Sequence, residues 1–140
     1  MFDLTKFTPT RKTDFEQLAR DRKEDFEALR EKGRWPASAY LGPYIVEARP
    51  KFKICEALGL ERLPAVLKTH DLVGLVIFAG LVGELEARPS LYDNFKKIAD
   101  IHKEVTSRYT VANPSHQADS NELNDWLFNP NDGVMTWLGL

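Results

Sequence analysis

Twelve residues of mostly apolar character run from Leu72 to Gly83 without a charged side chain, and no uncharged stretch of this chain is longer. A helix that crosses a membrane needs about 20 such residues, so this stretch is too short to span one and indicates a helix buried in a protein core. Because helical spacing continues on both sides, we predict a central helix over residues 70–86. The glycines at positions 74, 80 and 83 predict places where neighbouring helices approach its backbone closely.

Glycine and proline residues divide the remaining chain into segments of helix length. Thr13 and Glu16 have the spacing of a capping box, which predicts a helix that begins at Thr13 and ends at Gly33. Residues 34–50 contain three prolines and a glycine, which interrupt regular helices, so we expect an irregular segment of short turns and bends there. Gly59 predicts the end of a further helix.

These patterns predict an all-α fold, a compact bundle of about five helices around the central helix. With 140 residues, 43% hydrophobic and 29% charged, the chain has the size and composition of one globular domain, so we expect a single helical domain over residues 1–140. Three segments lie outside the main predicted helices: an N-terminal arm (1–12), a loop (111–120) and a hydrophobic C-terminal arm (121–140).

Cysteine content and the N-terminal sequence bear on the cellular compartment. Cys55 is the single cysteine, so no disulfide can form within the chain, and its apolar neighbours favour a buried thiol over a reactive one. The first residues lack the basic start and the apolar run of a secretory signal. We therefore expect a cytoplasmic protein, or a component of a phage particle, without a membrane span.

His70 directly precedes Asp71, and a histidine-aspartate doublet holds the metal ion in one large class of phosphohydrolases. Those enzymes also need a histidine upstream of the doublet, and none of the three histidines of this chain precedes His70. A structural role accounts for the doublet better, because Thr69 can cap a helix whose first turn contains Asp71. We therefore expect no metal ion at His70 and Asp71.

His102 is the second candidate metal ligand. Asp100 and Glu104 flank it at two-residue spacing, which puts the three side chains on different sides of a helix. Glu84 or Glu86, from the preceding helix, could meet His102 across an antiparallel pair, although such a pair is more commonly an ordinary surface ion pair. We predict no metal site and no cofactor.

The sequence contains no catalytic motif that would indicate an enzyme. The sequence contains no nucleophile elbow, no phosphate-binding loop and no dinucleotide-binding glycine pattern. The apolar surroundings of Cys55 also argue against a catalytic thiol, which needs a nearby base and an electropositive setting. We expect a non-enzymatic protein, and a small metal-dependent hydrolase that uses His102 is the third alternative.

A basic and aromatic segment, residues 40–53, gives the second hypothesis. Its side chains could bind a nucleic-acid strand by charge and by stacking. They are Tyr40, Tyr44, Arg49, Lys51 and Lys53. The net charge of the chain is −2, however, and a dedicated nucleic-acid binder has a much more basic surface. A nucleic-acid-associated accessory protein is therefore the alternative, and nucleic acid is not the partner that we expect.

The C-terminal arm gives the main hypothesis. It concentrates large apolar side chains within residues 126–140, and residues 111–140 carry four acidic and no basic residues. Such side chains dominate the energetics of protein interfaces. The residues predicted to bind a partner are Trp126, Phe128, Met135, Trp137 and Leu140. We expect a subunit or accessory protein of a larger cellular or phage assembly that binds another protein or its own copies, although the same side chains could instead complete the core.

Overall fold

The computed structural model describes residues 10–107 and 117–139. Within these two ranges the chain forms helices and connections without β-strands, so the all-α prediction is confirmed. The helices are α1 (Lys12–Glu31), α2 (Trp35–Leu58), the 3-10 turn η2 (Ala65–Leu67), α3 (Leu72–Phe78), α4 (Val82–Glu86), α5 (Pro89–Ser107), α6 (Gln117–Phe128) and α7 (Val134–Leu138). No helix in the described ranges combines the length and apolar character that crossing a membrane requires.

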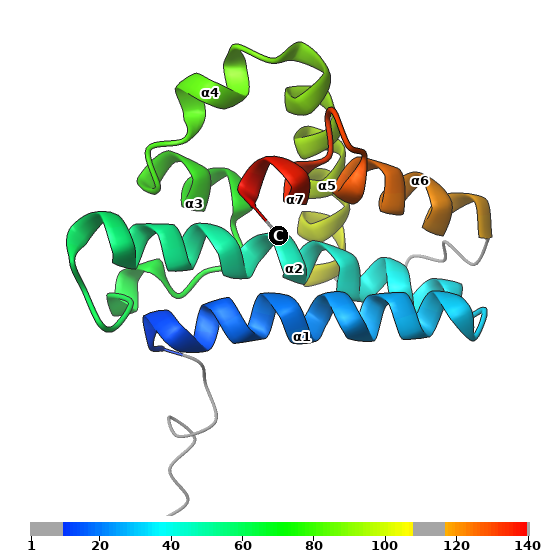
Figure 1. Ribbon diagram of the computed structural model, residues 1–140, viewed down its shortest axis with the longest axis horizontal. Helices are drawn as coiled ribbons and strands as arrows, with labels where there is room; N and C mark the ends of the chain where they lie inside the picture. The colour runs from blue at the N-terminus through cyan, green and yellow to red at the C-terminus, as the bar shows by residue number, and fades with distance from the viewer. Residues whose placement is uncertain (1–9, 108–116, 140) are drawn as a thin grey trace, which may run out of the picture.

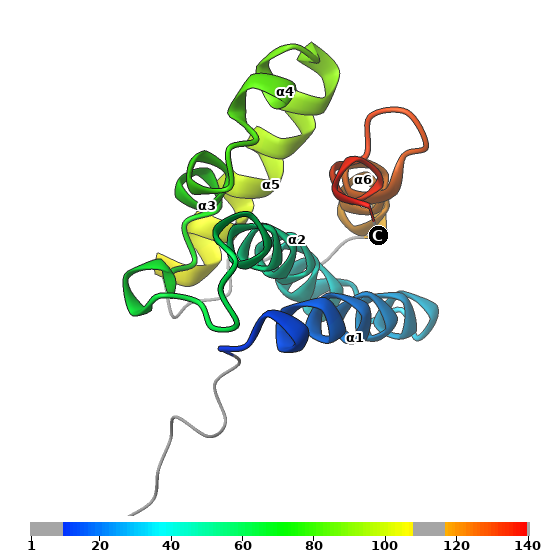
Figure 2. The ribbon, with the colours of Figure 1, turned by 60° about the vertical axis from the view of Figure 1, so that its left-hand side comes forward.

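Helix α2 occupies the centre of the bundle. It lies along α1, while α3, α5, α6 and α7 contact its other sides (Figure 1, Figure 2). The prediction of a central helix over residues 70–86 is therefore wrong, because that segment forms the two short helices α3 and α4. Buried side chains of α2 such as Ile45, Val46 and Ile54 meet neighbours on several sides, which explains why this helix has no single apolar stripe.

Residues 34–50, expected to form short turns and bends, belong almost entirely to the continuous helix α2. Pro36 lies in its first turn, where a missing amide hydrogen costs no helical hydrogen bond. Pro43 and Pro50 lie inside the helix, where a proline typically costs about 3 kcal/mol. Both prolines are buried. We infer that the helix continues through them because their packing against the surrounding elements offsets the free-energy cost of proline inside a helix.

The segment predicted to be the central helix breaks at Gly80. Its φ is +73°, a left-handed conformation that favours glycine. A Cβ at Gly80 or Gly83 would meet no atom within 4 Å, and the nearest neighbours of one at Gly74 would be side-chain atoms of Asp71, which caps the same helix. The predicted close approach of helices is found instead on α2, where a Cβ at Gly42 would lie 2.9 Å from Leu123 of α6.

The ends of the two long N-terminal helices test the predicted capping signals. Gly33 and Gly59 have positive φ values of +67° and +63° and lie where α1 and α2 end, as predicted. The start of α1 differs, because its cap is Arg11 and the carboxylate of Asp14 accepts a hydrogen bond from the Arg11 amide at 3.2 Å. The capping box therefore runs from Arg11 to Asp14, two residues earlier than the predicted box from Thr13 to Glu16.

The C-terminal arm packs into the main core. Val134 and Met135 are fully buried and Leu138 nearly so, on the face of α7 that meets α2, α5 and α6. Arg49 of α2 donates two hydrogen bonds to the carbonyl of Leu138, at 3.0 and 3.3 Å. The main core consists of Phe26, Ala39, Ile45, Val46, Leu72, Val76, Leu85, Leu91, Phe95, Ile98, Leu123, Leu127, Val134, Met135 and Leu138.

Two predicted segments lie partly outside the described residues. Of the N-terminal arm (1–12), only residues 10–12 are described, and Lys12 already belongs to α1. The loop predicted over residues 111–120 is described only from residue 117, where α6 has begun. Helix therefore replaces the expected loop at residues 117–120.

Candidate functional site

The buried carboxylate of Glu47, on α2, lies at the centre of a polar cluster. Its side chain is 8% exposed. Lys51 Nζ lies 2.7 Å from Oε1, and His102 Nε2, on α5, lies 2.9 Å from Oε2. His70, in the connection before α3, places Nδ1 3.0 Å from both oxygens. These four residues form the Glu47 cluster, in which three separate segments of the chain meet at one carboxylate.

Helical spacing and capping bring these side chains together. Glu47 and Lys51 are four residues apart on α2 and therefore lie on the same face. Asp71 caps α3 by accepting a hydrogen bond from the amide three residues later, at 3.1 Å, and Thr69 Oγ1 accepts one from the Asp71 amide. The two residues of the doublet therefore have different roles. Asp71 has a structural role as the cap of α3, a position predicted for Thr69, whereas His70 contacts Glu47 of α2.

The surroundings of Glu47 keep its carboxylate ionised. Burial acts to raise its pKa, but the hydrogen bond with His102 and the charge of Lys51 outweigh burial and lower the pKa to about 2. A carboxyl whose pKa is lower in the folded state contributes stability above its unfolded pKa, and that contribution is lost as the pH falls toward the folded value. The ionised carboxylate therefore stabilises the fold at neutral pH.

Tyr44 contacts both imidazoles of the cluster edge-on. Its ring centroid lies 4.7 Å from that of His102 and 5.8 Å from that of His70, and the ring planes are nearly perpendicular, at 88° and 81°. Burial, followed by the hydrogen bond with Tyr40, raises the pKa of Tyr44, so its hydroxyl stays neutral. These ring contacts restrict the orientations that the two imidazoles can take.

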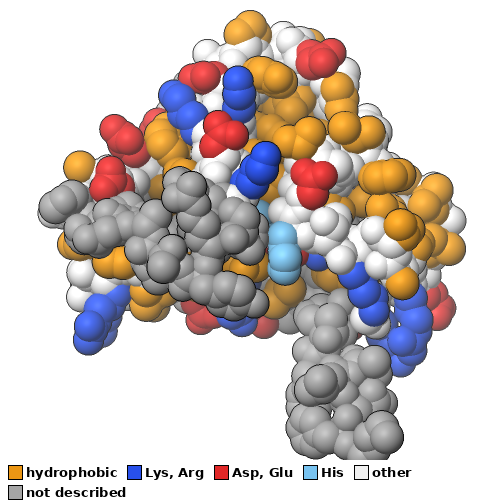
Figure 3. All heavy atoms as spheres, turned by 180° about the vertical axis from the view of Figure 1, so that it is seen from behind, with side chains coloured by type: hydrophobic (Ala, Val, Ile, Leu, Met, Phe, Trp, Pro, Cys, Tyr) orange, Lys and Arg blue, Asp and Glu red, His pale blue; other side chains and the backbone are white. Residues whose placement is uncertain are grey.

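Two surface pockets meet at His70. One, of about 620 Å³, is lined in part by Arg22 of α1, by α2 and by Lys68. The other, of about 600 Å³, lies between the start of α3 and α5 and includes Asp100. The His70 side chain is 60% exposed, whereas that of His102 is 1% exposed. Solvent therefore reaches the cluster on the His70 side, and histidine atoms are visible on the rear face of the molecule (Figure 3).

The structure brings together three of the five residues predicted to bind nucleic acid. Tyr40, Tyr44 and Lys51 line the 620 Å³ pocket, and the two tyrosine rings lie 5.5 Å apart. Arg49 instead binds the last turn of α7, and Lys53 does not line this pocket. Since Lys51 is paired with the Glu47 carboxylate, the positive charge that the sequence suggested for this segment is partly neutralised.

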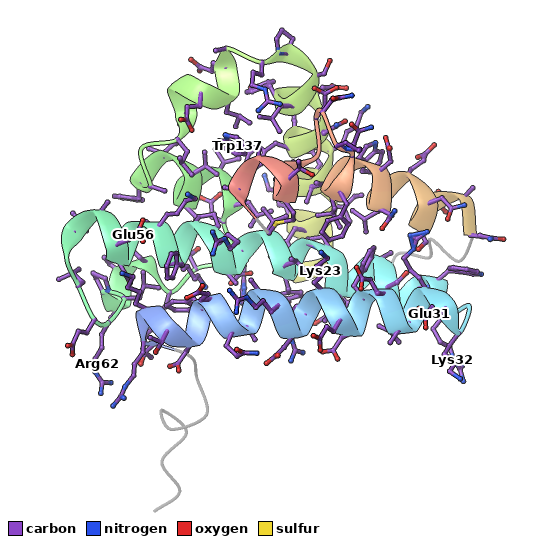
Figure 4. The ribbon with its side chains drawn as sticks, viewed as in Figure 1. Lys23, Glu31, Lys32, Glu56, Arg62 and Trp137 are labelled. Atoms are coloured by element: carbon purple, nitrogen blue, oxygen red, sulfur yellow. The ribbon has the colours of Figure 1, made fainter. Side chains whose placement is uncertain are left out.

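The residues predicted to bind a partner through the C-terminal arm differ in exposure. Met135 is fully buried, so a partner cannot reach it in this fold. Trp126, Phe128 and Trp137 are partly buried and pack against the main core, and Figure 4 shows Trp137 on α7. Leu140 lies outside the described residues. An interface on this arm would rest on the partly exposed aromatic side chains, and it stays a prediction.

Sequence reasoning missed Glu47 and paired His102 with other acids. Glu84 and Glu86 are exposed on α4, while His102 binds Glu47. A signal for Glu47 was present, because it is the single acidic residue among residues 32–55. Acidic side chains are rarely buried without a partner, so a lone acid in an apolar helix indicates a buried pair. Its partners, however, are far away in the sequence.

The Glu47 cluster has the donor atoms of a cation site. One ligand atom each from Glu47, His70 and His102 lie within 4.8 Å of one another. Neutral imidazoles and a carboxylate are common ligands of transition metals, and the same groups can also share protons through hydrogen bonds. Within the described residues, these three are the group of three or more histidine, cysteine or acidic side chains that lie close enough together to share one metal ion.

Comparison with known proteins finds no matching family model, no similar curated protein and no similar solved structure. A function for this chain is therefore inferred from its own residues, pockets and exposed surfaces.

Proposed function

We propose that this protein is a non-enzymatic interaction subunit or accessory protein that binds another protein through a hydrophobic surface at α3 and α5. One observation carries the proposal. Val73, Ile77 and Phe78 of α3 are 50%, 57% and 65% exposed, and Tyr92 of α5 is 45% exposed. These four residues are called the α3–α5 surface. Val73, Ile77 and Tyr92 line one pocket, Phe78 follows Ile77 directly, and exposed apolar side chains grouped in this way are typical of protein-binding sites.

The two sides of α3 explain why this surface is unusual. Leu72, Leu75 and Val76 are buried and face the bundle. A surface helix normally carries polar side chains on its opposite side, yet α3 has no charged residue within its seven positions. Figure 3 shows hydrophobic side chains gathered on the rear face, toward the side where α3 lies. Contact with a partner would remove this apolar area from water.

A pocket beside the surface supports docking by a protein side chain. It has a volume of about 310 Å³ and is lined mainly by apolar residues of α3, α4 and α5, including Val73, Ile77 and Tyr92. Charged groups also line it, among them Glu86 and Lys96. An apolar centre with charged groups at its margin is the usual organisation of a protein interface. The proposed partner therefore presents an apolar side chain surrounded by polar ones.

The position of this surface differs from that predicted from the sequence. The C-terminal arm contributes Val134, Met135 and Leu138 to the core, which leaves fewer of its side chains for a partner. α3 and α4 are short and lie at the periphery of the bundle (Figure 2). We therefore place the main interface on the α3–α5 surface, and Trp126 and Trp137 are at most secondary contacts.

Photo-crosslinking tests this proposal. A photoreactive amino acid at position 73, in cells that naturally make the protein, is expected to form an adduct with one specific protein, identified by mass spectrometry. Binding of that protein, purified, is then measured by calorimetry. We expect Ile77→Lys to weaken binding at least about tenfold, because it places a charge in the apolar centre of the interface.

Val66→Lys is the matched control. Val66 is 84% exposed on η2 and does not line the pocket, so this variant removes an exposed apolar side chain elsewhere and should bind like the unmodified protein. Both variants should keep the melting temperature within a few degrees. An adduct with a second copy of the chain would identify self-association. Unchanged binding of Ile77→Lys, or equal loss in both variants, would contradict the proposal.

A second candidate, binding of single-stranded nucleic acid, is favoured by the 620 Å³ pocket beside α1. There the Tyr40–Tyr44 ring pair lies near Arg22, Lys68 and His70, and Arg22 Nε is buried without a hydrogen-bond partner among the described residues. Aromatic rings beside basic groups bind nucleotides by stacking and by charge. Arg22 also pairs with a neighbouring acid at 3.3 Å, so fewer charges are available than the pocket suggests.

Fluorescence anisotropy with a labelled single-stranded RNA tests this second candidate. We expect the affinity for RNA to fall with rising salt concentration. Tyr40→Ala should lower the affinity because it removes a stacking ring, and Lys68→Ala should reduce the salt dependence by about one phosphate contact. Lys53→Ala is the control, since Lys53 does not line the pocket. Salt-independent binding, or no binding at all, excludes this function.

A further inference from the structure

We propose that Glu47, His70 and His102 bind a single divalent transition-metal ion, for which Zn(II) is the probe. The proposal does not depend on the protein-binding function above. From the sequence no metal site was predicted, because no histidine precedes the doublet and the acids considered for His102 were Glu84 and Glu86. In the structure Asp71 is occupied as a helix cap, and the acid beside His70 is Glu47.

The spacing of the donor atoms carries the proposal. His70 Nδ1 and His102 Nε2 lie 3.0 and 2.9 Å from the same oxygen of Glu47, Oε2. Ligands bound at about 2.1 Å to a tetrahedral ion lie roughly 3.4 Å from each other. All three donor atoms lie within 4.8 Å of one another, so side-chain shifts of about 1 Å would bring them to the spacing of a coordination sphere.

The chemistry and access of the site fit a transition metal. Two imidazole nitrogens and one carboxylate oxygen match the preference of Zn(II) and its neighbours, whereas Mg²⁺ and Ca²⁺ prefer oxygen ligands alone. Three protein ligands leave a fourth position, which solvent can occupy. Entry is available at His70, whose side chain is 60% exposed between two pockets, while Glu47 and His102 are buried and fixed by the fold.

The residues around the ligands hold them in place and also limit the affinity. Lys51 lies 2.7 Å from Glu47 Oε1, which orients the carboxylate and leaves Oε2 directed at the two histidines. Tyr44 contacts both imidazoles edge-on. The positive charge of Lys51 opposes a second cation nearby, so we expect weaker binding than at a site with an unshared carboxylate.

An ion at this site would join α2, the connection before α3, and α5, so binding should stabilise the fold. Zn(II) is titrated into untagged, full-length protein from which metals have been removed with a chelator. We expect one ion per chain by calorimetry, and a melting temperature raised by at least about 3 °C when the free ion exceeds its Kd a hundredfold.

Point variants separate this site from other zinc-binding groups. His70→Ala should fold, since His70 is exposed, and should lose the stoichiometric ion and the thermal shift. Glu47→Gln, of similar shape, should weaken Zn(II) binding at least tenfold. Glu84→Ala is the control: it removes an exposed carboxylate on α4 that is not part of the cluster, and it should leave both the melting temperature and Zn(II) binding unchanged. Binding that persists in His70→Ala and Glu47→Gln, or no binding by the unmodified chain, overturns the proposal and leaves the cluster as a hydrogen-bonded ion pair only.

Discussion

A chain that ends at Asn129 will not reach a stable folded state. The truncation removes Val134, Met135 and Leu138, which are all buried in the main core. Cutting a single buried leucine or methionine back to alanine typically costs about 2–5 kcal/mol. The combined loss is comparable with the whole stability of a domain of this size, roughly 5–15 kcal/mol. The hydrogen bonds from Arg49 to the Leu138 carbonyl are lost as well.

Circular dichroism during heating and in urea measures this effect. Met135→Ala is the milder variant and should lower the free energy of unfolding by about 2–5 kcal/mol. Thr136→Ala, at the exposed position that follows, should change it by less than about 1 kcal/mol. A truncated chain that melts at the same temperature as the full chain would mean that the arm is separable from the core. The interface predicted for it from the sequence would then become the leading hypothesis again.

Gly42→Leu will lower the free energy of unfolding by about 1–3 kcal/mol or more, because it overpacks the point where three helices meet. A Cβ at Gly42 would lie 2.9 Å from Leu123 of α6, 3.2 Å from Phe26 of α1 and 3.3 Å from Leu127 of α6. A leucine adds three more carbons at this point. The side chains around it are fully buried and have little space into which they can move.

Gly83→Leu is the matched control for Gly42→Leu. Gly83 lies in the short helix α4 and is exposed, and a Cβ there would meet no neighbour within 4 Å. Leucine should therefore be tolerated at this position and can improve helix propensity. Thermal melts should show a lower melting temperature for Gly42→Leu alone. Equal melting temperatures for both variants would mean that α1, α2 and α6 do not pack closely at Gly42.

The sequence by itself determined the helical class and several helix ends. Gly33 and Gly59 end helices as predicted because a left-handed residue is a local requirement that glycine meets without strain. The burial of Cys55 was also predicted correctly, since it follows from the apolar residues beside it. Such features depend on a few neighbouring residues, so they can be recognised without knowing the fold.

Only the tertiary structure decided which helix is central and where the polar cluster lies. Pro43 and Pro50 predicted interruptions, but the packing of the surrounding elements against α2 outweighs their local cost. The apolar segment over residues 70–86 contributes Leu72, Val76 and Leu85 to the main core, but an exposed turn at Gly80 breaks it into two short helices. Glu47 and His102 are 55 residues apart in the chain and meet only because α2 and α5 pack together. Contacts of this kind depend on how helices pack in space, and the pattern along a single chain does not specify that.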